Sequence, residues 1–170
     1  MRIEIRKFVR APRWRRLTVA ALALAACGTG DDGGLGPVPA VLSSATGQGR
    51  GSIVLVRDLR DPQWPADPVT ISDVAIEGDT IRLDVSFGGG CAEHHLQLIA
   101  DVVWAESYPV QVGARLAHEN NDDACDALIA GTLSFDLSPL KRAYQASYQS
   151  PTGKIALRLE GAPSVPVYEF

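Results

Sequence analysis

The 170-residue chain has few of the groups from which enzyme active sites are usually built. It contains three histidines and three cysteines, and the G-x-S-x-G, H-E-x-x-H and P-loop motifs are missing from it. The histidines His94, His95 and His118 lie close to two of the cysteines, which disfavours a dispersed catalytic triad. The sequence therefore favours a protein without enzymatic activity, and it predicts no cofactor.

Aromatic residues are also scarce, at 6% of the chain. We therefore expect an aliphatic core that is anchored by one or two of Trp64, Trp104 and Phe135. The uncharged run Leu17–Ala26 is too short for a transmembrane helix, which needs about 20 apolar residues. It follows the segment 1–16, which holds seven basic residues and one acidic residue. This order is typical of a secretory signal peptide over residues 1–26.

The end of this segment reads Leu24-Ala25-Ala26-Cys27 and is followed by a glycine. It resembles the lipobox of bacterial lipoproteins. The resemblance implies cleavage before Cys27, diacylglycerol on its thiol and a third acyl chain on the new amino terminus. Two or more buried acyl chains are enough for stable anchoring to a membrane. A glycine after Cys27 is not the aspartate that can retain lipoproteins on an inner membrane, so the periplasmic face of an outer membrane is the expected location.

The charge of the mature chain limits its partners. Removal of residues 1–26 leaves 9 of the 16 basic residues and 19 of the 20 acidic residues, a formal charge of −10. Such a chain is repelled by nucleic acids and by anionic headgroups. The sequence therefore predicts a membrane contact through the lipid on Cys27, no nucleic-acid partner, and an envelope protein or a glycan as the possible ligand.

Residues 27–51 are rich in glycine, proline, serine and threonine and predict a flexible tether. Residues 52–170 predict one all-β domain, an antiparallel β-sandwich of seven or eight strands, immunoglobulin-like or similar. The expected strands and the one expected helix are residues 53–56, 69–77, 80–87, 94–104, 108–116, 128–137, 140–146 (helix, with Ser138 as N-cap and Pro139 as its first residue), 154–160 and 165–170. Gly78-Asp79 predicts a hairpin, and an offset in the alternation of 69–77 predicts a bulge.

Cys91 and Cys125 are the two cysteines of the predicted domain, and they allow two interpretations. In an oxidising compartment they favour a disulfide, because the predicted hairpin between them can bring their ends together. Alternatively, Cys91, His94, His118 and Cys125 form a zinc-compatible set of two thiolates and two imidazoles. With the cysteines oxidised, His94 and His118 with Asp122 or Asp123 could still bind a metal ion. A solvated turn and polar strand ends are the competing explanation for these residues.

The glycines 88–90 precede Cys91 directly. We expect at least one to have a positive φ, so that the chain turns and Cys91 reaches Cys125 across the sandwich. The alternative is a glycine floor beneath a ligand site that is bordered by His94 and Asp122.

Several of these positions together resemble exported bacterial lipoproteins of the NigD-like family, in particular their C-terminal β-sandwich. The matching residues are Gly89, Gly90, Cys91, His94, Asn121, Asp123, Cys125 and Phe135 to Ser138. The resemblance implies no activity. The leading interpretation is a lipid-anchored, non-enzymatic binding or structural module stabilised by a disulfide. The rival is a zinc-binding protein or a metal-dependent enzyme.

Overall fold

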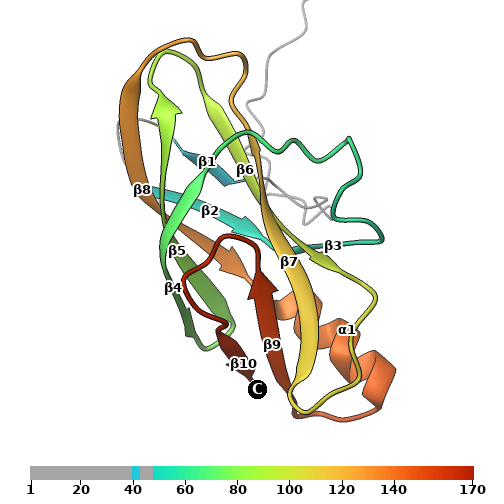
Figure 1. The fold of residues 1–170 in the computed structure, drawn as a ribbon. Helices are drawn as coiled ribbons and strands as arrows, with labels where there is room; N and C mark the ends of the chain where they lie inside the picture. The colour runs from blue at the N-terminus through green and yellow to red at the C-terminus, as the bar shows by residue number, and fades with distance from the viewer. Residues whose placement is uncertain (1–39, 43–47) are drawn as a thin grey trace, which may run out of the picture. The chain divides into compact units, whose positions relative to one another are not determined.

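The computed structural model describes residues 40–42 and 48–170. The predicted signal peptide, Cys27 and most of the predicted tether lie outside the described residues. Two sheets and one helix make up the described part (Figure 1). This arrangement confirms the predicted all-β sandwich.

The six-stranded sheet, here called sheet A, has the order β1-β6-β7-β9-β10, and β3 also pairs with β6. Its strands are β1 (Ala40–Leu42), β3 (Val54–Val56), β6 (His94–Asp101), β7 (Val110–Glu119), β9 (Lys154–Leu159) and β10 (Val167–Glu169). The four-stranded sheet B has the order β2-β8-β5-β4. Its strands are β2 (Gln48–Ser52), β4 (Thr70–Glu77), β5 (Thr80–Gly89) and β8 (Ala127–Asp136).

The sheets are mixed and not purely antiparallel as predicted. β2 runs parallel to β8, β3 to β6, and β7 to β9. Parallel neighbours need a crossover connection, and here the chain leaves sheet A after β7 and returns to it only at β9. Between the two it forms β8 in sheet B and then the helix α1 (Ser138–Tyr148). The same argument applies to the parallel pair β3 and β6, between which the chain forms β4 and β5 in sheet B.

Strand β2 lies partly within the stretch 27–51 that the sequence predicts as a tether. Its sequence Gln-Gly-Arg-Gly-Ser has no apolar alternation, so no strand is visible in it. It is nevertheless an edge strand, because it pairs along its full length with β8. The structured part therefore begins before residue 52.

Strand β5 of sheet B follows the predicted alternation closely. In β5 the side chains of Ile81, Leu83, Val85 and Phe87 are buried. The β4–β5 hairpin turns at Gly78, whose φ is +57°, and β4 has the predicted irregularity between Ile71 and Asp73. Such a bulge shifts the facing of the residues that follow it, which explains the offset pattern.

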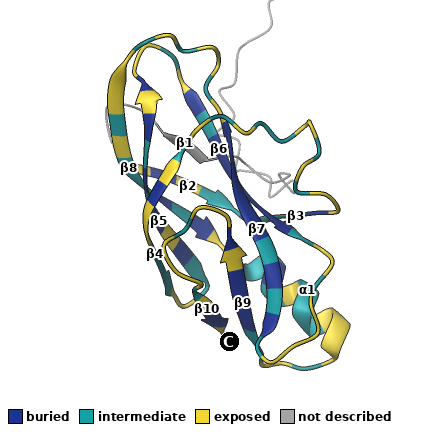
Figure 2. Cartoon of the chain, in the orientation of Figure 1, coloured by how far each residue is buried: buried dark blue, intermediate teal, exposed yellow. Residues whose placement is uncertain are grey.

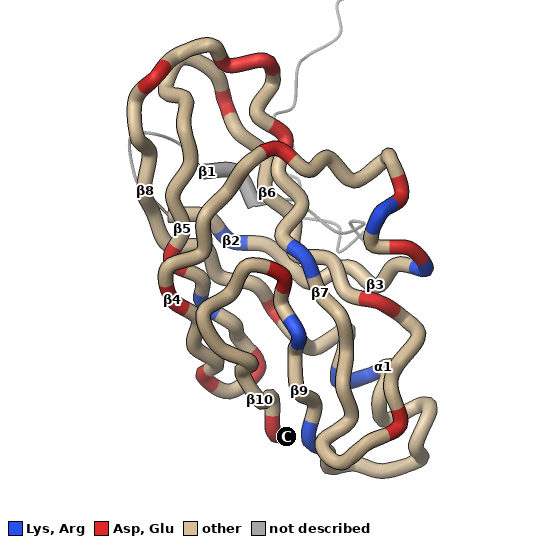
Figure 3. The backbone as a smooth tube through the Cα atoms, in the orientation of Figure 1, with Lys and Arg blue, Asp and Glu red and all other residues tan. Residues whose placement is uncertain are grey.

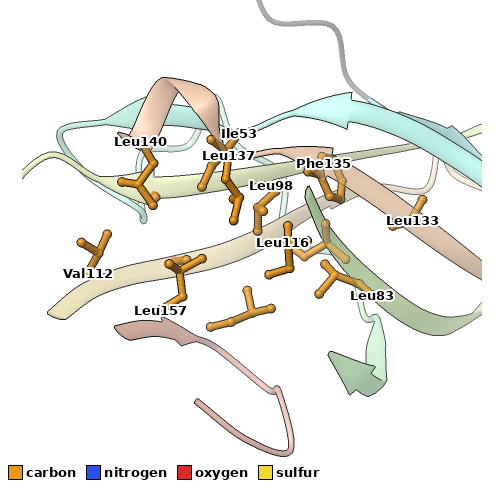
Figure 4. Close-up of a cluster of buried hydrophobic side chains, with 14 of the residues drawn as sticks. Ile53, Leu83, Leu98, Val112, Leu116, Leu133, Phe135, Leu137, Leu140 and Leu157 are labelled. Carbon is orange, nitrogen blue, oxygen red and sulfur yellow. The ribbon is translucent and has the colours of Figure 1, made fainter. Parts of the chain in front are cut away.

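The core fills the space between the two sheets (Figure 2). Figure 4 shows Leu137 and Leu140 from the start of α1 beside Ile53, with Phe135 and Leu83 of sheet B nearby. Phe135 is fully buried as expected, whereas Trp64 and Trp104 are only partly buried. The largest fully buried side chain is Tyr168, whose hydroxyl donates a hydrogen bond to Asp79 at 2.6 Å.

The helix α1 starts at Ser138, one residue earlier than predicted. Leu137 occupies the N-cap position and Ser138 is the first helical residue, so the prediction of Ser138 as N-cap is wrong. The amide of Ser138 instead donates to the Asp136 carboxylate at 2.9 Å. Pro139 lies in the first turn, where its missing N–H has no consequence.

Candidate functional site

A disulfide joins Cys91 and Cys125, with 5.9 Å between their Cα atoms. Cys91 follows β5 and Cys125 precedes β8, and these strands are antiparallel neighbours in sheet B, where Gly89 pairs with Ala127. The bond therefore closes one end of a single sheet. The expectation that it crosses the sandwich is wrong, because the ends of β5 and β8 already lie side by side.

Asp123 lies under this disulfide with its side chain fully buried. Its Oδ2 accepts hydrogen bonds from the amides of Gly90, Cys91 and Ala92 at 2.7, 2.9 and 2.8 Å. Its Oδ1 accepts one from the amide of Cys125 at 2.9 Å. The hydrogen bonds from Ala92 and Cys125, against the opposing effect of burial, hold the pKa of this carboxyl far below its usual value.

The glycine run builds the cradle for this carboxylate. Gly89 and Gly90 have φ angles of +148° and +120°, which confirms that at least one of the three has a positive φ. A Cβ on Gly89 would lie 2.5 Å from Nε2 of His94 and 2.9 Å from Oδ2 of Asp123, whereas Gly88 has open space around it. The space next to Gly89, where the alternative interpretation places a ligand, is therefore filled by the side chains of His94 and Asp123.

Two histidines continue the network inward from Asp123. Nε2 of His94 lies 3.2 Å from Oδ2 of Asp123, and its Nδ1 lies 2.9 Å from Nε2 of His118. Nδ1 of His118 lies 3.1 Å from the carbonyl oxygen of Pro68. Both imidazoles are 1% exposed, and Phe87 stacks on the ring of His94 with 4.6 Å between centroids. We call His94, His118 and Asp123 the histidine–aspartate cluster.

The contacts within this cluster restrict which ring nitrogens carry protons. The carboxylate requires a proton on Nε2 of His94, the Pro68 carbonyl requires one on Nδ1 of His118, and the contact between the rings requires a third. Two neutral imidazoles carry only two such protons. With both rings neutral, two of these three contacts can therefore be hydrogen bonds at one time. Burial is the main cause that lowers the pKa of His118.

The predicted metal ligands are only partly brought together. His94, His118 and Asp123 converge, but Asp122 is exposed at a φ of +55°, and its amide donates to the side chain of Asn120. Donor atoms of Cys91, Asp123 and Cys125 also lie within 4.8 Å of one another. Both sulfurs are in the disulfide, however, and the ring nitrogens already have partners within the protein. The metal site stays a prediction, and a metal ion would have to displace these contacts.

His95 lies on the opposite face of β6 from His94, as the alternation of a strand requires. That outer face of sheet A is covered in part by the β3–β4 loop, residues 57–69. Together they form a pocket of about 350 Å³ between the loop residues Trp64 and Pro65 and the strand residues His95, Gln97, Ala117 and Glu119. We call it the sheet A pocket. Within the described part of the chain, three buried side-chain nitrogen or oxygen atoms lack a hydrogen-bond partner, and Trp64, His95 and Gln97 carry them.

Sequence reasoning missed this pocket. Trp64 is predicted only as a core anchor, and Gln97 is hidden in a strand that is apolar on both faces. The signal that could have found it is the polar pair His95 and Gln97 two residues apart on one face of β6.

The sequence also holds an S-x-x-K spacing at Ser138 to Lys141. There the ammonium of Lys141 is paired with Asp79 at 2.7 Å.

No protein-family model matches the chain, and no curated protein matches it. Among solved structures it resembles a NigD-like immunity protein from Bacteroides caccae, with a TM-score of 0.50 and 15% identity over 70% of this chain and 63% of that one. A protein of unknown function from Bacteroides vulgatus has a TM-score of 0.45 and 15% identity over 74% of this chain and 56% of that one. A candidate lipoprotein from Bacteroides fragilis has a TM-score of 0.47 and 12% identity over 71% of this chain and 69% of that one. The chain thus spans less than two thirds of the first two proteins, and the first likeness shows a shared fold.

Proposed function

We propose that this chain is a lipid-anchored envelope protein that binds a ligand without changing it chemically. The observation that carries the proposal is the contrast between its two polar sites. The histidine–aspartate cluster is enclosed, and each of its ring nitrogens has a partner within the protein. The sheet A pocket is open at the surface, and three of its residues carry unpartnered polar atoms.

The anchor part of the proposal rests on the lipobox resemblance at Cys27. No helix among the described residues is long and apolar enough to cross a bilayer. The charge of the chain adds support for a neutral or cationic ligand, and Figure 3 shows acidic residues along the connection between β7 and β8. These include Asp122, Asp123 and Asp126, and Glu119 is the last residue of β7.

Expression of the full chain in a bacterium with two membranes tests the anchor. We expect the protein to enter the detergent phase and to carry three acyl chains by mass spectrometry. Cys27→Ala should move it to the aqueous phase. Partition into detergent that survives Cys27→Ala would contradict the proposal, and sucrose-gradient separation of the two membranes tests the outer-membrane address.

A further inference from the structure

The sheet A pocket has a floor and a wall from different parts of the chain. The floor consists of neighbouring residues of β6 and β7, because Gln97 pairs with Ala117 and His95 with Glu119. The wall is the loop segment that contains Trp64 and Pro65. Three segments distant in sequence therefore converge on one space.

The wall is held rigidly to the sheet. The guanidinium of Arg115 donates to the carbonyl oxygens of Leu59, Trp64 and Pro65 at 3.0, 2.9 and 3.1 Å. The amide of His118 also donates to the carbonyl of Pro65 at 3.1 Å. The backbone of the wall is therefore in place before a ligand arrives, which lowers the entropic cost of binding.

Two hydrogen bonds fix the orientation of the Gln97 side-chain amide in the pocket lining. Its residue is only 6% exposed, and its amide nitrogen donates to the carbonyls of Ser52 and Leu98 at 2.7 and 3.0 Å. These two bonds assign the nitrogen, so the other atom, Oε1, is an unpartnered acceptor. Nε1 of Trp64 is an unpartnered donor, and Nδ1 of His95 can serve as either. Buried groups of this kind are costly unless a partner reaches them.

We propose that the sheet A pocket binds a neutral saccharide unit, an inference that rests on the proposed binding function. Hydroxyl groups donate and accept together, which fits a site that offers a donor, an acceptor and an imidazole. The side chains of Trp64, Pro65 and Ala117 provide apolar surface for the C–H face of a sugar ring. The Glu119 carboxylate at the pocket and the negative charge of the chain disfavour an anionic ligand. All three polar atoms are buried, so binding requires the side chains around them to move and open these atoms to the sugar.

Nuclear magnetic resonance on the full mature chain with Cys27→Ala tests this inference. The probes are cellobiose and N,N′-diacetylchitobiose, with glucuronic acid as the anionic counterpart and acetyl-trialanine amide as the peptide probe. We expect at least one neutral disaccharide to shift the Trp64 indole N–H and the Gln97 side-chain amide, with a Kd near or below about 1 mM. The Trp104 indole, which donates to the Asp101 carbonyl at 2.9 Å, is an internal reference that should not move.

Three variants sharpen the result. Trp64→Phe keeps an aromatic ring but removes the donor, and it should weaken saccharide binding about three- to tenfold. The matched control Trp104→Phe should leave binding unchanged. Glu119→Gln should strengthen glucuronic acid binding while changing that of the neutral sugar less than about twofold.

The outcomes separate the two proposals. If the peptide probe shifts the pocket resonances and both disaccharides fail at about 20 mM, the saccharide assignment is overturned and the binding function stands. If no probe moves them, and water alone occupies the pocket, both fall. Undiminished saccharide binding by Trp64→Phe would also overturn the assignment.

Discussion

Asp123 is an acidic residue of a surface loop whose side chain is nevertheless fully buried. Its exposed neighbours Asp122 and Asp126 form the solvated turn that the sequence suggests. The difference comes from the four amides that converge on Asp123, which replace the water that an ionised carboxylate loses on burial. One residue in an acidic run therefore fastens both sides of the disulfide.

At this scale we predict a loss of stability in acid. The pKa of His118 is lowered in the folded state, so as the pH falls below about 6.5 the unfolded chain takes up this proton first. The pKa of Asp123 is also lowered, so its contribution is present above about 3.8 and is lost as the pH falls through its folded value. Both groups act in the same direction, and urea unfolding between pH 7.5 and 3 should show a steady decline.

Two variants assign the decline to these groups. His118→Gln should reduce the slope of the free energy of unfolding against pH below about 6.5. Asp123→Asn should lower the melting temperature at pH 7 far more than Asp122→Asn, since Asp122 is exposed. Equal effects of the two aspartate variants would contradict the role given to the buried carboxylate.

Among the elements, the β3–β4 loop accepts three hydrogen bonds from a single side chain of sheet A. Arg115 is 6% exposed and donates to three carbonyl oxygens of this loop, and burial lowers its pKa. We predict that Arg115→Lys reduces the free energy of unfolding by about 1.5–3 kcal/mol, because a point-like ammonium cannot reach three carbonyls. Chemical denaturation measures the loss, and Arg82→Lys, at an exposed position of β5, is the control. A loss below that of the control would contradict this function of Arg115.

The turn after β5 gives a second prediction at this scale. Gly89→Ala should destabilise the oxidised protein by about 1–3 kcal/mol, because the new Cβ meets His94 and Asp123 in a backbone conformation that alanine avoids. Gly88→Ala is a matched control with open space around it and should change little. Thermal melts of both variants, repeated with Cys91→Ala and Cys125→Ala, test whether the turn serves the disulfide. Similar melting temperatures for the oxidised forms of Gly89→Ala and Gly88→Ala would contradict the prediction that the glycine turn serves the disulfide.

The elements that the sequence predicts well are those whose alternation reflects burial on one side. In β5 and β9 the inward residues, such as Leu83 and Leu157, stand at every second position, so strand and facing follow together. Strand β2 escapes detection because it has no apolar alternation and pairs with β8 through its backbone. The pairing of Cys91 with Cys125 follows from their places beside neighbouring strands. The pocket does not, since Arg115 and Trp64 meet only through tertiary contacts 51 positions apart.

The sandwich as a whole is closed by different chemistry at two places. The disulfide and the histidine–aspartate cluster close one end of sheet B. Elsewhere, Asp79 in the β4–β5 turn accepts hydrogen bonds from Tyr168 of β10 and Lys141 of α1. An aromatic group that includes Trp104, Tyr144 and Phe170 packs around the helix. Most residues of the apolar core between the two sheets belong to neither closure.

This separation allows a final prediction about the disulfide and its zinc alternative. The purified mature chain should be two protons lighter than its reduced form, with no free thiol and no stoichiometric zinc. Cys91→Ala with Cys125→Ala should lower the free energy of unfolding by about 3–4 kcal/mol, since the bond spans a sequence separation of 34 residues. The circular dichroism spectrum should remain that of a β protein, because Leu83, Leu98 and Leu157 stay buried between the sheets. Two free thiols with one zinc ion per chain would instead support the set Cys91, His94, His118 and Cys125, and would require the histidine–aspartate cluster to open.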